Sequence, residues 1–93
     1  MDIVVILFQA SQVHAMGYTV TGSGAADIST SFDDFRNKSL PWSQKASVSG
    51  FGDLRTLEAH SLSGSSITCS ISIDGKVEDR QTGTGNCFCS TTL

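Results

Sequence analysis

The chain has 93 residues, a formal net charge of −3 at pH 7 and only 16% charged residues. A chain of this length forms one small domain, in the range where burial is incomplete and an extra covalent constraint is often useful. The six basic residues are scattered rather than arrayed in a stripe, which argues against binding to a nucleic-acid backbone. Serine and threonine supply 24 positions and glycine nine, a mixture that favours an exposed all-β domain.

Residues 1–16 differ from the rest because they contain one unbroken apolar run, Ile3 to Phe8. We expect this segment to be the tail of a truncated signal peptide or membrane anchor, since Ala15 with Val13 before it resembles an export-peptidase site. The alternative is an extra strand of the domain. The run alone is far shorter than the roughly 20 apolar residues that span a bilayer. The domain itself is therefore expected at residues 17–93.

The next part of the chain alternates apolar and polar residues, the period of strands with one buried face. Tyr18 and Val20 alternate with threonines, and residues 26–32 continue the alternation after a Gly-Ser-Gly turn. Residues 33–39 are predicted to form a loop, because they show no apolar periodicity.

Residues 40–49 predict another strand, with Pro41 at its start or on a sheet edge because proline cannot donate to a ladder. Trp42 is predicted to anchor the core or the end of a sandwich, since large aromatic side chains dominate small cores. Residues 54–62 are predicted to be a strand with a bulge, because their apolar residues fall out of phase.

The last third of the chain carries the clearest pattern. Residues 66–73 alternate cleanly, with Cys69 on the apolar face, and Asp74-Gly75 predicts a type I′ hairpin turn. A partner strand follows with Val77 as its apolar member, then a turn at residues 83–86 and a closing strand that starts at Cys87. About seven short antiparallel strands result, which predicts an immunoglobulin-like two-sheet β-sandwich, with a small barrel as the alternative.

Three cysteines, Cys69, Cys87 and Cys89, are the residues with the most chemistry. A disulfide between the strand at 66–73 and the closing strand is the simplest interpretation, and Cys87 and Cys89 share a face, so either could reach Cys69. Zinc bound by these thiols and His60 is the alternative, but their spacing matches zinc sites poorly. We therefore predict no metal and no cofactor.

Nothing in the sequence predicts a catalytic arrangement. His14 and His60 are the only imidazoles and neither lies in a recognisable nucleophile-base motif, so His14 is interpreted as a flanking residue and His60 as a solvated one. The acidic pairs Asp33-Asp34 and Glu78-Asp79 are interpreted as charges that favour solubility and protect sheet edges. We expect no enzymatic activity.

Three segments carry a resemblance. "YTVTGSGAADIS", "LPWS" and "ITCSISIDGKVEDRQTGTG" with a late "CFC" resemble, in the same order, the soluble domain of the mycobacterial small membrane protein (MmpS) family. The resemblance covers about residues 17 to 91. It implies an immunoglobulin-like β-sandwich outside the cytoplasm, held by one amino-terminal membrane helix, that assists a large transporter of the resistance-nodulation-division (RND) type in exporting lipids or siderophores.

The same resemblance assigns roles to single residues. It implies a disulfide between Cys69 and Cys89, because Phe88-Cys89 matches the aromatic-Cys ending of the family, and it places Trp42 on the family tryptophan. The chain departs from the family pattern in two places. Cys87 is an additional thiol, and only the short apolar run Ile3 to Phe8 corresponds to the membrane anchor of the family.

Three functions follow as expectations. The first is a non-enzymatic, extracytoplasmic accessory domain, membrane-anchored or secreted, that supports an RND-type exporter through protein contacts. The second is a secreted actinobacterial binding module without a transporter, which holds a small or lipid-like ligand in the apolar space between its sheets. The third is a redox protein or enzyme that uses Cys87 and Cys89.

Overall fold

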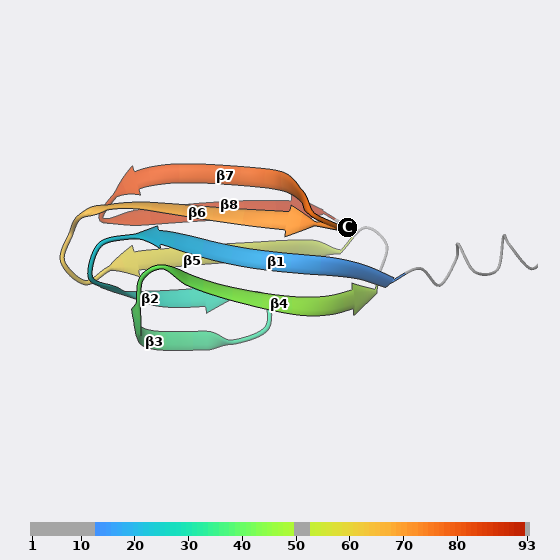
Figure 1. Cartoon of the computed structure of the whole chain (residues 1–93), viewed down its shortest axis with the longest axis horizontal. Coiled ribbons are helices and arrows are strands. Elements are labelled where there is room, and N and C mark those ends of the chain that lie inside the picture. Colours follow the sequence, from blue (N-terminus) through green and yellow to red (C-terminus); the bar gives the residue numbers. More distant parts are fainter. Residues whose placement is uncertain (1–12, 50–52, 93) are drawn as a thin grey trace, which may run out of the picture.

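The computed structural model describes residues 13–49 and 53–92, which fold into two four-stranded antiparallel sheets (Figure 1). Sheet A has the strand order β4-β1-β6-β7 and sheet B the order β3-β2-β5-β8. The strands are β1 (Val13–Gly22), β2 (Ala25–Thr30), β3 (Asp34–Ser39), β4 (Trp42–Ser49), β5 (Leu54–Ser61), β6 (Ser66–Ile73), β7 (Lys76–Thr84) and β8 (Asn86–Thr92). The predicted all-β two-sheet sandwich is confirmed, with eight strands in place of about seven.

The core lies between the two sheets and is filled by the inward-facing side chains, which occupy alternate positions along the strands. Its largest fully buried side chains come from both sheets: Met16, Tyr18 and Val20 from β1, Ile28 from β2, Leu57 from β5, and Ile67 and Ile71 from β6. Full burial of an aliphatic or aromatic side chain contributes about 1.5–3 kcal/mol. The period-two pattern of the sequence therefore corresponds directly to the buried face of each sheet.

The amino-terminal boundary of the sandwich lies earlier than expected. β1 begins at Val13, and Met16 is 1% exposed in the core, so the expected domain start at residue 17 falls inside β1. The predicted anchor or signal segment, Ile3 to Phe8, lies outside the described residues. Residues 13–49 and 53–92 contain no helix that is long and apolar enough to cross a membrane.

The predicted loop at residues 33–39 is wrong, because most of it forms β3. This strand pairs with β2 at the edge of sheet B and turns five of its six side chains to solvent, so it has no alternating buried face. Only Phe35 packs against the core. Hydrogen bonds to β2, rather than apolar periodicity, hold this strand in place.

The predicted bulge in residues 54–62 is absent as well. β5 pairs in continuous register with β2 and with β8, and Leu57, Ala59 and Ser61 face the core. The apparent phase error arises because Leu54 and Leu62 are 61% and 51% exposed, whereas the polar Ser61 takes a buried position.

The hairpin between β6 and β7 has the predicted turn. Asp74 and Gly75 adopt φ angles of 52° and 83°, which fits a type I′ turn with positive φ at both central residues. The next turn is tighter than the predicted 83–86 segment, since β7 continues to Thr84 and Gly85 alone has a positive φ of 85°.

The two flanks of the sandwich differ. On one side β7 lies against β8, whereas β3 and β4 form the opposite side (Figure 1). A register shift between Ile71 and Ser72 turns Val77 outward, where it is 45% exposed, and turns Asp79 inward. Asp79 accepts a hydrogen bond from the backbone amide of Ser90 at 3.0 Å and thereby joins the two sheets. The acidic residue interpreted as a surface charge therefore closes this flank.

We expect Asp79→Ala to lower the free energy of unfolding by about 1 kcal/mol, because the amide of Ser90 on the edge of β8 loses a charged acceptor. Because Asp79 is partly exposed, solvent screening weakens this hydrogen bond, and the loss is smaller than for a fully buried charged hydrogen bond. Urea unfolding followed by the fluorescence of the single tryptophan measures this change. Glu78→Ala, at the exposed neighbour, is the matched control, and an equal loss in both variants would contradict the role of Asp79.

Candidate functional site

The three cysteines meet in the core, where sheet A faces sheet B. β6 supplies Cys69 and β8 supplies Cys87 and Cys89, whose side chains both point inward as the two-residue spacing predicts. The Cys89 thiol donates a hydrogen bond to the backbone carbonyl of Cys69 at 3.0 Å, and the two Sγ atoms lie 3.5 Å apart. The structure therefore brings Cys69, Cys87 and Cys89 together, as the sequence predicted.

The environment of the thiols keeps them protonated. Burial raises the pKa of Cys69 far above its usual range, and hydrogen bonds with Cys87 and Cys89 raise it further. Burial also raises the pKa of Cys87 and of Cys89, although the hydrogen bond with Cys69 opposes the shift in both. Because the thiolate is the nucleophile and the metal ligand, a cluster of buried neutral thiols is poorly suited to either chemistry.

The residues of the alternative zinc site, the three cysteines and His60, do not lie together in the structure. His60 projects from the outer face of sheet B, whereas Cys87 and Cys89 lie on its inner face, so the imidazole and the thiols are separated by the sheet. Among residues 13–49 and 53–92, no group of three or more His, Cys, Asp or Glu side chains is arranged to hold a metal ion.

The structure holds all three cysteines as free thiols, so the disulfide between Cys69 and Cys89 stays a prediction. Trp42 occupies the first position of β4, where it is partly buried and packs against the core. Its ring centroid lies 5.2 Å from that of Phe35 on β3, so Trp42 links the edges of the two sheets.

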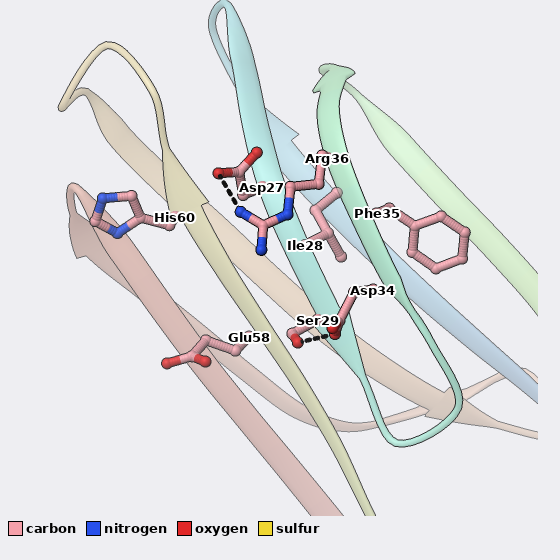
Figure 2. A pocket seen from close by; sticks show the side chains of 8 residues that line it. All are labelled: Asp27, Ile28, Ser29, Asp34, Phe35, Arg36, Glu58 and His60. Carbon is pink, nitrogen blue, oxygen red and sulfur yellow. Dashed lines mark hydrogen bonds and ion pairs between the residues drawn. The ribbon is translucent and has the colours of Figure 1, made fainter.

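An open pocket of about 250 Å³ lies on sheet B, bounded by side chains of β2, β3 and β5 (Figure 2). Its lining is mainly polar and charged, and consists of Asp27, Ile28, Ser29, Asp34, Phe35, Arg36, Glu58 and His60. Cross-strand pairing brings Asp27 beside His60 and Ser29 beside Glu58. The sequence reasoning missed this group, since its members come from three strands and one of those strands was predicted to be a loop.

Most of these polar groups already have partners that hold β3 against β2. Asp27 accepts the backbone amide of Asn37 at 2.9 Å and lies 3.8 Å from the Arg36 guanidinium. Ser29 donates a hydrogen bond to the carboxylate of Asp34 (Figure 2). The pocket is therefore chiefly a seam between two strands, and its polar lining does not suit a lipid.

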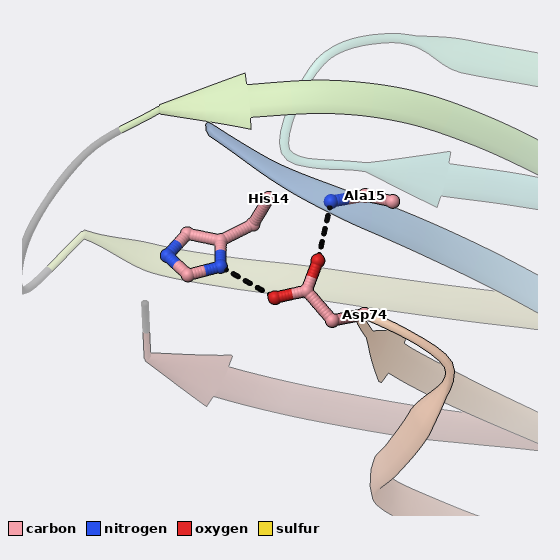
Figure 3. Close-up of polar contacts among 3 residues, drawn as sticks. All are labelled: His14, Ala15 and Asp74. Carbon is pink, nitrogen blue, oxygen red and sulfur yellow. Dashed lines mark hydrogen bonds and ion pairs between the residues drawn. The ribbon is translucent and has the colours of Figure 1, made fainter. Parts of the chain in front are cut away.

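A second polar contact that the sequence reasoning missed lies at the end of sheet A. His14 donates from Nδ1 to Asp74 Oδ2 at 2.7 Å, while Asp74 Oδ1 accepts the amide of Ala15 at 2.9 Å (Figure 3). The backbone amide of Asp74 also donates to the carbonyl of Ala15 at 2.7 Å. The hairpin turn thus clamps the beginning of β1, and His14 is part of the fold rather than only a flanking residue.

Comparison with known proteins gives no assignment: no protein-family model and no curated protein matches the chain. The resemblance based on the three sequence segments stays a prediction.

We expect oxidised protein to contain one bridge, Cys69–Cys89, and one free thiol at Cys87. Cleavage after Phe88 separates Cys87 from Cys89, so mass spectrometry of the non-reduced peptides identifies the partner of Cys69 directly. Closing a loop of about 20 residues would add about 3 kcal/mol to the free energy of unfolding in the chain-entropy model. Three alkylatable thiols in the non-reduced protein, or a Cys69–Cys87 peptide, would refute the pairing.

The clamp at Asp74 predicts an acid-sensitive contribution to stability. The hydrogen bond from His14 and then the amide of Ala15 lower the pKa of Asp74. A carboxyl group with a lowered pKa in the folded state stabilises the fold fully above its unfolded pKa of about 3.9, and the contribution disappears as the pH falls through the folded value.

His14→Ala removes the largest cause of this shift, so we expect the pKa of Asp74 to rise towards its ordinary value and acid unfolding to begin at a higher pH. NMR titration of the Asp74 carboxyl carbon measures the first effect, and circular dichroism against pH the second. His60→Ala, at an exposed imidazole on sheet B, is the control. An unchanged Asp74 titration in the His14 variant would disprove the explanation.

Proposed function

We propose that this protein is a non-enzymatic, extracytoplasmic β-sandwich that acts through protein-protein contacts as an accessory to a large membrane exporter of the RND type. The exporter class and the location come from the resemblance of three sequence segments to the mycobacterial small membrane proteins. The observation that best supports the proposal is that all three segments contribute adjacent strands to one sheet.

Each of the three segments contributes to sheet A, through β1, β4 and β6, although these strands are far apart in the sequence. The rest of the first segment and the late "CFC" lie in β2 and β8 of sheet B. Val20 of the first segment pairs with Trp42 of the second on one side and with Cys69 of the third on the other. The arrangement groups matched residues of all three segments in one part of the fold, and the exporter role is proposed from the sequence resemblance itself.

The chemistry of the described residues favours a contact function over catalysis. The thiols are buried and neutral at ordinary pH. His14 is engaged in the clamp with Asp74, and His60 stands on the outer face of sheet B, so the two imidazoles serve different parts of the molecule. The exposed surface instead offers sheet edges, which suit the addition of a partner strand.

The alternative of a lipid-binding module is less well supported. Large side chains from both sheets fill the space between them, including Tyr18, Met16 and Leu57, each no more than 1% exposed. The pocket on sheet B is open and mainly polar. Apolar ligands bind in mostly apolar concave sites, so the described surface favours protein contacts.

Chemical crosslinking of the tagged full-length protein in its native membrane, followed by affinity purification, tests the proposal. We expect a large multi-spanning membrane protein to co-purify in crosslinked samples and to be absent from samples that carry the tag alone. Recovery of the protein only in free form, with no membrane protein enriched over the control, would reject the exporter role.

A further inference from the structure

Three of the four sheet edges carry features that oppose the addition of another strand. β7 and β8 lie against each other, and the side chain of Asp79 accepts a hydrogen bond from the backbone amide of Ser90 at the edge of β8. β7 also has a register shift opposite Ile71 and Ser72. Bulges, charges and covering elements are the usual means of protecting an edge strand.

β3 is protected in a different way. Its register with β2 shifts between Ala26 and Ile28, and Asn37 adopts a φ of 54°, which interrupts the extended backbone. The amide of Asn37 is taken by the side chain of Asp27 at 2.9 Å. The strand is therefore irregular at its centre and offers no continuous ladder.

β4 lacks the register shifts, the positive-φ residue and the covering contacts of the other three edges. All eight of its residues, Trp42 to Ser49, pair with β1 in one unbroken register, and Lys45 is its only charged residue. Among residues 13–49 and 53–92, no strand pairs with its other edge. A regular edge with unpaired backbone groups is a template for β-augmentation.

The side chains around this edge suit an added strand. On the inner side, Trp42 and Phe35 are partly buried and touch across the gap between the sheets, which leaves aromatic surface available to further apolar groups. Gln44, the next inward residue of β4, has its Oε1 buried and without a hydrogen-bond partner among the described residues.

The charges of the open flank favour an acidic partner. β3 and β4 carry Arg36, Lys38 and Lys45, half of the six basic residues of the chain, and one of its nine acidic residues, Asp34. Arg36 faces Asp27 at 3.8 Å but keeps 82% of its side chain exposed. The flank is therefore locally basic on a chain whose net charge is −3.

From these observations we infer that β4 accepts an extended segment of a partner protein as a fifth strand of sheet A. Apolar side chains of that segment pack inward on Trp42 and Phe35, and the alternating outward ones are acidic and face Lys45. This inference rests on the proposed function and names the place where the partner binds.

A second copy of this chain fits the edge less well. In an antiparallel pair of β4 strands, the outward lysines of both copies would lie on one face of the joined sheet, beside two basic β3 strands. Like charges across a strand pair are destabilising, whereas acidic residues at those positions are favourable.

Site-specific photocrosslinking of the full-length protein in its native membrane tests the inference. A benzoylphenylalanine is placed at Ser47, an exposed outward position of β4, or at Thr82, the matched exposed position on β7. We expect an adduct with a membrane protein from Ser47 and none from Thr82. The amides of β4 that point away from β1 should also exchange hydrogen at least tenfold more slowly in the purified complex than in the free protein, which contact through side chains alone would not cause.

Charge reversal provides the matched variants. Lys45→Glu is expected to lower the adduct yield from Ser47 about fivefold or more, since about 1 kcal/mol of lost attraction corresponds to that factor. Arg80→Glu, an exposed reversal on β7, should change the yield less than twofold. Circular dichroism confirms that both variants fold.

The possible results separate the inference from the proposed function. Co-purification of a membrane protein without an adduct at Ser47, or with an adduct only at Thr82, would overturn the β4 site and leave the exporter role standing. An adduct of two copies of the chain, or one within a single chain to residues 1–12, would also overturn it. Absence of both the adduct and co-purification would reject the proposed function itself.

Discussion

The pairing of β1 with two strands at once is the constraint on which the rest of the structure depends. β1 joins β4 on one side and β6 on the other, and its inward residues Met16, Tyr18 and Val20 fill the middle of the core. A one-residue slip of β1 would turn all three outward, so apolar burial determines the register. That register places Val20 between Trp42 and Cys69 and leaves β4 as an edge strand.

The stabilising contacts are distributed unevenly between the two flanks. The side formed by β7 and β8 has the hydrogen bond from Ser90 to Asp79, and the neighbouring strands β6 and β8 bring the thiols of Cys69 and Cys89 together. A bridge between these cysteines would reinforce the flank that is already closed. The opposite flank has mainly the contact between Phe35 and Trp42 to join its sheets, and it keeps a regular edge available.

The sequence predicted those parts of the fold in which burial alone decides the conformation. The alternation in residues 66–73 and the Asp74-Gly75 turn are confirmed, because both depend on local rules of side-chain direction and φ angle. β3 was not predicted, because an edge strand held by backbone pairing need not show an alternation of apolar and polar residues in its sequence. The thiol cluster was predictable from spacing, whereas the clamp between His14 and Asp74 was not, because it joins residues 60 positions apart through side chains at two strand ends.

Lys45 explains how a regular strand edge can be kept at an exposed surface. An unprotected strand invites pairing with any similar edge, including another copy of the same chain, and a single lysine in the middle of an edge is a common defence against this. The same charge attracts a segment with acidic residues at alternate positions. The charge of Lys45 thus disfavours self-association and favours a partner of opposite charge. β4 can therefore keep its regular register with β1, whereas β3 has a shifted register with β2.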